Sequence, residues 1–254
     1  MAIDFNSFIL IFTRVVSMLF SIPILGARNV QKGFKIGLGF FISMILMHII
    51  KVDTSVLSTN LLSLGIAISG EFLIGFIIGL MAKLIFTAVE MAGELIGFQM
   101  GFGIVNVIDP TTSSQVPIIG QFQTILCSLI FLSINAHHYF ITALAESFLL
   151  VPPSHFGISG GLLNGIIKLA GDMFVLAVKI GSPVIVVLFL TNVAMGVISK
   201  AIPQINVFIN GFPLTIAGGI LFISLSLPLF AYLMQKVFEG MRGNMMDVLS
   251  VMGR

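Results

Sequence analysis

Charged residues are scarce in this sequence. Of its 254 residues 9% are charged and 57% are hydrophobic, whereas about 25% are charged in an average soluble domain. Twelve basic and ten acidic side chains cannot cover the surface of a water-soluble chain of this length. The net charge of +2 offers no basic surface for nucleic acid. The composition excludes an ordinary cytosolic enzyme, a disordered tail and a nucleic-acid binder, and it indicates an integral membrane protein.

Cysteine and tryptophan are also nearly missing. The single cysteine, Cys127, excludes a disulfide framework and a cysteine-ligated metal site. There is no tryptophan and there are only two tyrosines, although both residue types normally form the aromatic belts of membrane proteins. We therefore expect much of the surface to contact protein instead of lipid. Asp4 precedes the first apolar run and Arg14 interrupts it, so we expect no cleavable signal peptide.

The apolar runs do not match the length of about 20 residues that spans a bilayer. Helix fits them better than strand, because they are long and lack period-2 alternation. We predict an all-α integral membrane protein without a soluble domain, with about six hydrophobic helical segments, several of them broken or of non-spanning length. The last run is expected to break at Pro213 and Gly218-Gly219. The predicted segments are Phe8–Gly26, Ile36–Ile50, Leu61–Val107, Phe122–Ile134 resuming as Tyr139–Val151 after Asn135, His137 and His138, then Leu162–Ser199 and Ile205–Phe230.

Gly93, Gly97 and Gly101 follow one another at intervals of four residues. Small residues at this spacing let two helix backbones approach closely in an apolar medium. The pattern predicts close helix packing here, either inside the chain or at a seam between subunits.

Lys83, Glu90 and Glu94 fall, with Thr87, within a narrow sector of one helix. Glu90 and Glu94 are like charges at i,i+4, which repel unless they are neutralised. Such a stripe is costly in lipid and should face protein or water. We interpret it as the lining of a conduit or as a charged seam between subunits. The alternative is an internal ion pair beside one protonated carboxylate.

The stretch from Asn106 to Gly120 is rich in small polar residues, and its Asp-Pro step ends the preceding helix. It is either a plain surface turn or a re-entrant loop that fills a pore, which is tolerated where backbone lines a protein cavity. The candidate residues of this loop and its apolar flanks are Phe102, Val105, Asn106, Asp109, Pro110, Thr111, Thr112, Ser113, Ser114 and Pro117.

Two enzymatic patterns fail. Gly157-Ile158-Ser159-Gly160 matches the serine string of intramembrane proteases, but no histidine follows His155 to act as the base. His137 and His138 are adjacent, so on a helix they point about 100° apart and cannot share a metal. We predict no catalytic residue, no cofactor and no metal site.

The last segment, from Phe230 to Met252, is amphipathic, with a methionine-rich apolar face. The pattern predicts an adaptable docking surface or a helix that lies in the headgroup plane.

Several strings together resemble the FliR family of flagellar biosynthesis proteins, whose injectisome counterpart is the SctT family. The resemblance covers nearly the whole chain. The string Pro203-Gln204-Ile205-Asn206-Val207-Phe208 is the most specific, and Gly211-Phe212-Pro213-Leu214 after it looks more flagellar than injectisome-like. The other matching positions are Arg14, Pro23, Gly93-Glu94, Gly97, Gly101, Asp109-Pro110, Asn135, His137, His138 and Pro152.

This resemblance implies a non-enzymatic subunit of the bacterial flagellar type III protein export gate, through which unfolded flagellar proteins are secreted. It implies a FliP-like part over residues 1–155 and a FliQ-like helical hairpin over 156–254. The implied partners are FliP, FliQ, FlhB and FlhA homologues, with one copy of this chain in each gate, in the bacterial inner membrane and the flagellar basal body. The resemblance also places a pore plug at Asn106–Pro117.

The residues alone leave one other function open, which is a small ion-coupled secondary transporter. Its ion sites would be Glu71, Glu90, Glu94 and Asp172. Such folds often contain paired inverted halves, and no convincing internal symmetry is visible here. Arg28, Lys32 and Lys35 predict a cytoplasmic first loop by the positive-inside rule.

Overall fold

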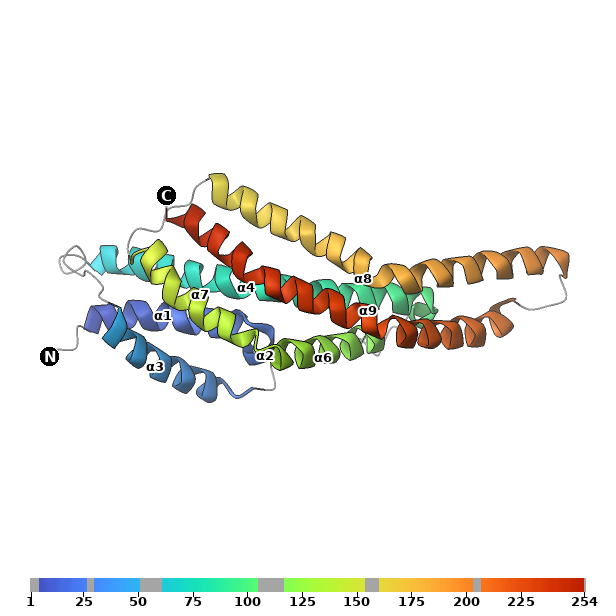
Figure 1. The fold of residues 1–254 in the computed structure, drawn as a ribbon, viewed down its shortest axis with the longest axis horizontal. Coiled ribbons are helices and arrows are strands. Elements are labelled where there is room, and N and C mark those ends of the chain that lie inside the picture. Colours follow the sequence, from blue (N-terminus) through green and yellow to red (C-terminus); the bar gives the residue numbers. More distant parts are fainter. Residues whose placement is uncertain are drawn as a thin grey trace. The chain divides into compact units, whose positions relative to one another are not determined.

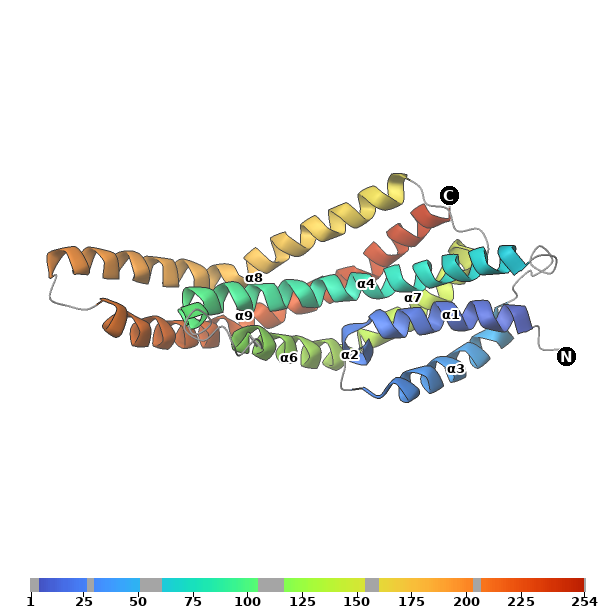
Figure 2. The ribbon, with the colours of Figure 1, turned by 180° about the vertical axis from the view of Figure 1, so that it is seen from behind.

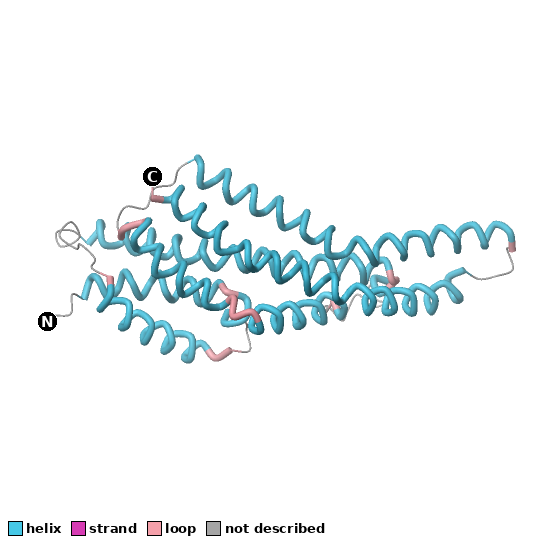
Figure 3. The backbone as a smooth tube through the Cα atoms, in the orientation of Figure 1, coloured by secondary structure: helices cyan, strands magenta, loops and turns pink. Residues whose placement is uncertain are grey.

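The computed structural model describes residues 5–26, 30–50, 61–104, 117–153, 160–202 and 207–253. All regular elements in these ranges are helices, as Figures 1 and 3 show, which confirms the prediction of an all-α protein. The elements are α1 (Phe5–Ser21), α2 (Pro23–Gly26), α3 (Lys32–Ile49), α4 (Leu61–Gln99), the 3-10 turn η1 (Phe102–Ile104), α6 (Ile118–Ser133), α7 (His137–Leu150), α8 (Gly160–Ala201) and α9 (Val207–Met252).

Three of these helices are far longer than a membrane span. Helices α4, α8 and α9 contain 39, 42 and 46 residues, or about 59 to 69 Å at 1.5 Å per residue, against a hydrocarbon core of about 30 Å. Within the described residues, four helices are long and apolar enough to cross a membrane, or five if α6 and α7 form one broken span. The mismatch of lengths predicted from the sequence is confirmed.

The predicted breaks in the last run were wrong. Helix α9 continues through Pro213, Gly218-Gly219 and Pro228 to Met252, and α8 likewise contains Pro183. A proline removes one backbone hydrogen bond and kinks a helix. In an apolar setting, however, ending the helix would leave many more backbone groups without partners. The helices therefore pass through these prolines.

The chain forms two compact units, and each long helix contributes to both. The first unit comprises residues 1–84, 132–170 and 238–254, and the second comprises 85–131 and 171–237.

In the first unit, α1 lies between α3 and the first half of α4, as Figure 2 shows. Two glycines allow the close approach of α1 and α4. A side chain at Gly75 would collide with the Arg14 carbonyl and the Ser17 hydroxyl, and one at Gly79 would collide with Ser21. Small residues at this spacing bring helix backbones into contact, as they do in membrane helix pairs generally.

A buried ion pair joins α1, α4 and α7. The Arg14 Nε and Nη2 atoms donate to the two Glu71 carboxylate oxygens at 2.5 and 3.0 Å. Arg14 makes its other contacts with α7 and the residue that follows it. It donates to the Ser147 hydroxyl and to the Val151 carbonyl, both at 3.0 Å. Its guanidinium carbon lies 4.0 Å from the centroid of the Phe148 ring. Both charged side chains are essentially inaccessible to solvent. Each charge is thus neutralised and hydrogen-bonded, as burial requires.

Replacing Glu71 by Leu is expected to destabilise the first unit by about 3–5 kcal/mol, because the Arg14 charge would stay buried without a partner. Protease resistance in native membranes across a denaturant series measures the loss. The double variant Arg14→Met/Glu71→Leu removes both charges and should recover most of the resistance. A Glu71→Leu variant as resistant as wild type would show that the ion pair contributes nothing to stability.

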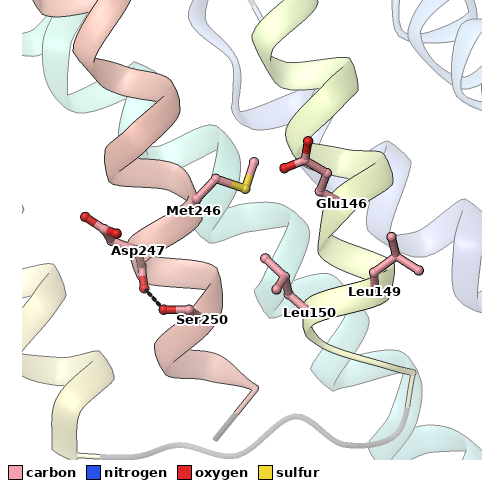
Figure 4. A pocket seen from close by; sticks show the side chains of 6 residues that line it. All are labelled: Glu146, Leu149, Leu150, Met246, Asp247 and Ser250. Atoms are coloured by element: carbon pink, nitrogen blue, oxygen red, sulfur yellow. Dashed lines mark hydrogen bonds between the residues drawn. The ribbon is translucent and has the colours of Figure 1, made fainter.

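The methionine-rich face of the last segment does not form a docking surface, and that prediction was wrong. In the first unit the side chains of Met241, Met245, Leu249 and Met252 are buried inside the chain. Figure 4 shows the end of α9 beside the end of α7, with a shallow groove between them. The groove is lined by Glu146, Leu149, Leu150, Met246, Asp247 and Ser250. The amphipathic pattern correctly predicts which residues form the apolar stripe. It does not indicate whether the stripe packs within the chain or against a partner.

In the second unit, the later part of α8 and the earlier part of α9 run antiparallel and side by side (Figures 1 and 2). The apolar core of this unit draws on α4, α8 and α9, and its buried members are Ile96, Met100, Val184, Leu188 and Ile223. Cys127 is buried here too, with its Sγ 3.8 Å from the Met234 Sδ. Its burial confirms the interpretation of this cysteine as a small core residue.

Candidate functional site

Just after α4 ends at Gln99, the chain turns at Gly101, which lies against α9 in the second unit. Gly101 has φ +94°, a backbone conformation that favours glycine. The ring of Phe212 fills the space that a side chain at Gly101 would need, since a Cβ there would lie 2.5 Å from the Phe212 Cε1. The chain then enters η1 with Phe102. The end of α4 is therefore fixed in direction before residues 105–116.

A second contact from α9 fixes the same helix end. Thr215 is buried, and its hydroxyl donates to the Met100 carbonyl at 3.2 Å, with the Gly211 and Phe212 carbonyls at 3.2 and 3.1 Å. Carbonyl groups at the C-terminal end of a helix lack intrahelical partners. The Thr215 contact thus satisfies a group that would otherwise be buried and unpaired.

Helix α6 is held against α4 through two glycines. A Cβ on Gly93 would collide with the backbone of Gly120, and a Cβ on Gly120 would lie 2.9 Å from the Glu90 carbonyl. The α6 helix begins directly after Pro117, whose carbonyl accepts from the Gln121 N–H at 2.7 Å. The glycine spacing predicted close helix packing, and the structure finds that packing inside the chain.

Residues on both sides of the undescribed segment 105–116 lie near Gly97. A Cβ at Gly97 would lie 3.9 Å from the Ile119 side chain and 4.0 Å from the Phe102 ring. Phe102 and Ile119 also pack on the apolar core of the second unit. We call Gly97, Phe102 and Ile119 the loop base.

Two acidic side chains lie beside the glycine contact. Glu90 and Glu94 are exposed on α4, next to Gly93 and Gly97 on the helical wheel. Lys83 is exposed earlier on the same helix. In the described part of the chain, no basic nitrogen lies within 4.0 Å of either carboxylate. The internal ion pair considered as an alternative for this stripe is therefore absent among the described residues.

Several predicted site residues lie outside the described residues, and their roles stay predictions. Phe208 lies in α9, within the first turn after the undescribed segment. The undescribed positions are Val105, Asn106, Asp109, Pro110, Thr111, Thr112, Ser113 and Ser114 of the loop, and Pro203, Gln204 and Asn206 of the most specific string.

Phe212 and Thr215 are site residues that the sequence does not predict. Phe212 belongs to the string Gly211-Phe212-Pro213-Leu214. The periodicity of the sequence does not indicate that this part of α9 contacts the end of α4. A glycine that needs φ > 0 predicts a turn, yet it does not tell which side chain covers it.

Among the described residues, no group of three His, Cys, Asp or Glu side chains is placed to hold a metal ion.

Comparison with known proteins identifies the family to which the sequence is similar. The model of the family described as "Bacterial export proteins, family 1" matches residues 5–241. The chain is 34% identical over 254 residues to the flagellar biosynthetic protein FliR of Bacillus subtilis, covering 98% of this chain and 96% of that protein. It is 30% identical over 239 residues to FliR of Pectobacterium carotovorum (94% and 91% covered) and 29% identical over 238 residues to FliR of Escherichia coli (93% and 90% covered).

The described residues form long apolar helices packed through glycines, which define a helical membrane protein. The family match spans nearly the whole chain, and so does a relative above 30% identity. The chain therefore belongs to the bacterial export proteins of family 1.

Proposed function

We propose that this chain is a subunit of the flagellar type III protein export gate and helps to form and seal the channel for unfolded flagellar proteins. The observation that carries this proposal is the end-to-end similarity to proteins named flagellar biosynthetic protein FliR. The long apolar helices agree with a membrane-embedded flagellar component. The role is structural and involves no enzymatic step of this chain.

The proposed setting is the bacterial inner membrane at the flagellar basal body. One copy of the chain would assemble with FliP and FliQ homologues, and FlhB and FlhA homologues would join at the entrance of the gate. Helices α4, α8 and α9 support an assembly of this kind, because helices about twice the hydrocarbon thickness need protein neighbours outside the bilayer. Residues 1–155 would correspond to the FliP-like part and residues 156–254 to the FliQ-like hairpin.

We assign the seal to Asn106–Pro117, as a pore plug. A plug must stay in place between substrates and move aside when one passes. The loop base lies on both sides of this segment along the chain, since Phe102 precedes it, Ile119 follows it, and both lie near Gly97. An apolar constriction can also exclude ions by dewetting, and Phe102 and Ile119 supply apolar surface at this point. A plug on a fixed base fits both requirements.

The secondary transporter is the weaker proposal. Glu71, one of its four candidate ion sites, is neutralised by Arg14 in a buried, fully hydrogen-bonded pair. A carboxylate held in this way cannot bind a coupling ion without leaving Arg14 unpaired. The family match favours export.

The proposal is tested by expressing the chain alone and with FliP and FliQ homologues. The expected result is degradation or aggregation of the solitary chain, because charged and glycine-lined surfaces would lack neighbours. Co-expression should rescue it and yield a single complex in mild detergent. Size-exclusion chromatography with light scattering measures the outcome. A stable, monodisperse monomer that forms no complex with the co-expressed FliP and FliQ homologues would overturn the proposal.

A further inference from the structure

Three residues of α9 in the second unit contact the two residues that follow α4. Phe212, Thr215 and Gly219 are spaced by three and four positions, so they share one side of α9. The ring of Phe212 covers Gly101, and the Thr215 hydroxyl donates to the carbonyl of Met100 at 3.2 Å. We call Phe212, Thr215 and Gly219 the α9 clamp.

Gly219 gives the α9 clamp a notch for the Met100 side chain. A Cβ at Gly219 would lie 2.7 Å from the Cγ, Sδ and Cε atoms of Met100, so the thioether occupies the space that a larger residue would need. Methionine fills irregular gaps of this kind well. Met100 is fully buried. Its side chain lies on Gly219 and its carbonyl on Thr215, so α9 holds this residue at two points.

The backbone of Gly101 does not fix its own direction. Its φ is +94°, and its N–H donates to the Phe98 carbonyl at 3.1 Å in a single turn. Glycine adopts φ of either sign at little cost, so more than one direction is open to the chain beyond α4. The Phe212 ring lies 2.5 Å from the Cβ position of Gly101 and restricts the backbone there. The α9 clamp thus selects the direction in which η1, with Phe102, follows α4.

The α9 clamp lies beside the contacts that hold the second unit together. Ile96, Val184 and Ile223, one each from α4, α8 and α9, join the three helices in one apolar core. None of these three side chains belongs to the clamp, and Phe212 is only half-buried. Loss of one clamp contact therefore leaves this core in place. It should change the position of η1 more than the fold of the unit.

We infer that the α9 clamp positions η1 for the seal of the export gate, and that Phe212 and Thr215 are positioning residues for this seal. Phe102 of η1 supplies apolar surface there, and an apolar constriction that excludes ions by dewetting must be narrow. A loosened clamp would let Phe102 take more than one place in the assembled gate. The inference rests on the proposed function, because the seal belongs to that function. Its signature is an ion leak at an unchanged yield of assembled complex.

The test removes one hydroxyl group from the α9 clamp. Thr215→Val keeps the shape of the side chain and abolishes its hydrogen bond to Met100, whereas Thr215→Ser keeps the hydroxyl. Each variant is co-expressed with FliP and FliQ homologues, and the purified complexes are compared by yield and by ion conductance in a planar bilayer. We expect conductance to rise by up to about tenfold in Thr215→Val, the factor that corresponds to one hydrogen bond. Thr215→Ser should be as tight as wild type, and both variants should assemble with wild-type yield.

Phe212→Ala tests the second contact of the α9 clamp. Removing the ring frees the backbone of Gly101, so the conductance of the assembled complex should again rise. Leu214→Ala is the matched control, because Leu214 is half-exposed on the opposite side of α9, about 200° from Phe212 on the helical wheel. This control should stay as tight as wild type.

Assembled Thr215→Val and Phe212→Ala complexes that are both as tight as wild type would overturn the inference. An equal leak in Thr215→Ser and Thr215→Val would also overturn it, since the hydroxyl would then not be the cause. A lower yield of complex, with no leak in the complexes that remain, would assign the clamp to folding alone and contradict the inference as well. Failure of the wild-type chain to form any complex would instead refute the proposed function.

Discussion

Deleting Thr111–Ser114 is expected to leave an assembled gate that leaks ions. The deletion leaves Gly97, Phe102 and Ile119 and the contacts among them in place, because all three residues lie outside the deleted stretch. Helices α4 and α6 should therefore keep their packing and the complex should form. The shortened segment would no longer reach across a pore. Conductance of the purified complex in a planar bilayer, or growth inhibition of cells by small ions, measures the leak.

A control variant of unchanged length separates the effect of loop length from the effect of changing the loop's side chains. Thr111→Ser/Thr112→Ser keeps the number of residues and the hydroxyl groups, and it should stay as tight as wild type. If the deletion variant assembles and is also as tight as wild type, the 105–116 segment is not the plug. The seal would then lie elsewhere, for example in a ring of partner side chains.

Changing Glu90 and Glu94 together to Leu is expected to block export while helix content barely changes. Both carboxylates are exposed on α4 beside the close contact of Gly93 with Gly120. No basic nitrogen among the described residues lies within 4.0 Å of them, and we expect a partner subunit or water in a conduit to meet their charge. Leucine would remove that interaction and leave the partner group unpaired, which costs more than the pair itself contributes. Secretion of a flagellar protein into the medium is the measurement.

Asp247→Leu provides a matched comparison, because Asp247 is also an exposed acidic residue, on α9. It should export normally. Export at the wild-type level by an assembled Glu90→Leu/Glu94→Leu gate would show that these carboxylates are merely tolerated on the surface of α4. That result would refute the charged seam or conduit at Glu90 and Glu94, and it would not bear on the proposed plug.

The sequence predicted the helical class and the packing glycines because both depend on local composition and spacing. Gly93 and Gly97 indicated close approach of helices, and the structure supplies the neighbours, Gly120 and Ile119. The spacing could not choose between a partner inside the chain and one outside it, because four-residue intervals serve both. The same ambiguity explains the wrong prediction for Met241, Met245 and Met252, whose apolar stripe packs within the first unit.

The helix ends were harder to predict from the sequence. Pro213 was expected to break α9, but in an apolar setting a kinked helix leaves fewer unpaired backbone groups than a broken one. Phe212 and Thr215 lie more than 100 positions from the glycine and carbonyl that they contact. Pairs so far apart leave no periodic trace in one sequence. The ion pair of Arg14 with Glu71 was hidden for the same reason, although each charge alone was conspicuous in its apolar run.

The central claim is that exported protein passes the loop of this subunit, and site-specific photo-crosslinking during export tests it most directly. A photoreactive amino acid is placed at Ser113 in the loop and, as a control, at Phe41, which is exposed on α3. A flagellar export substrate fused to a tightly folded domain is stalled in the gate. The account predicts an adduct between Ser113 and the stalled substrate, and none at Phe41 or without the substrate. Efficient stalling with no adduct at Ser113, or with equal adducts at both positions, would contradict it.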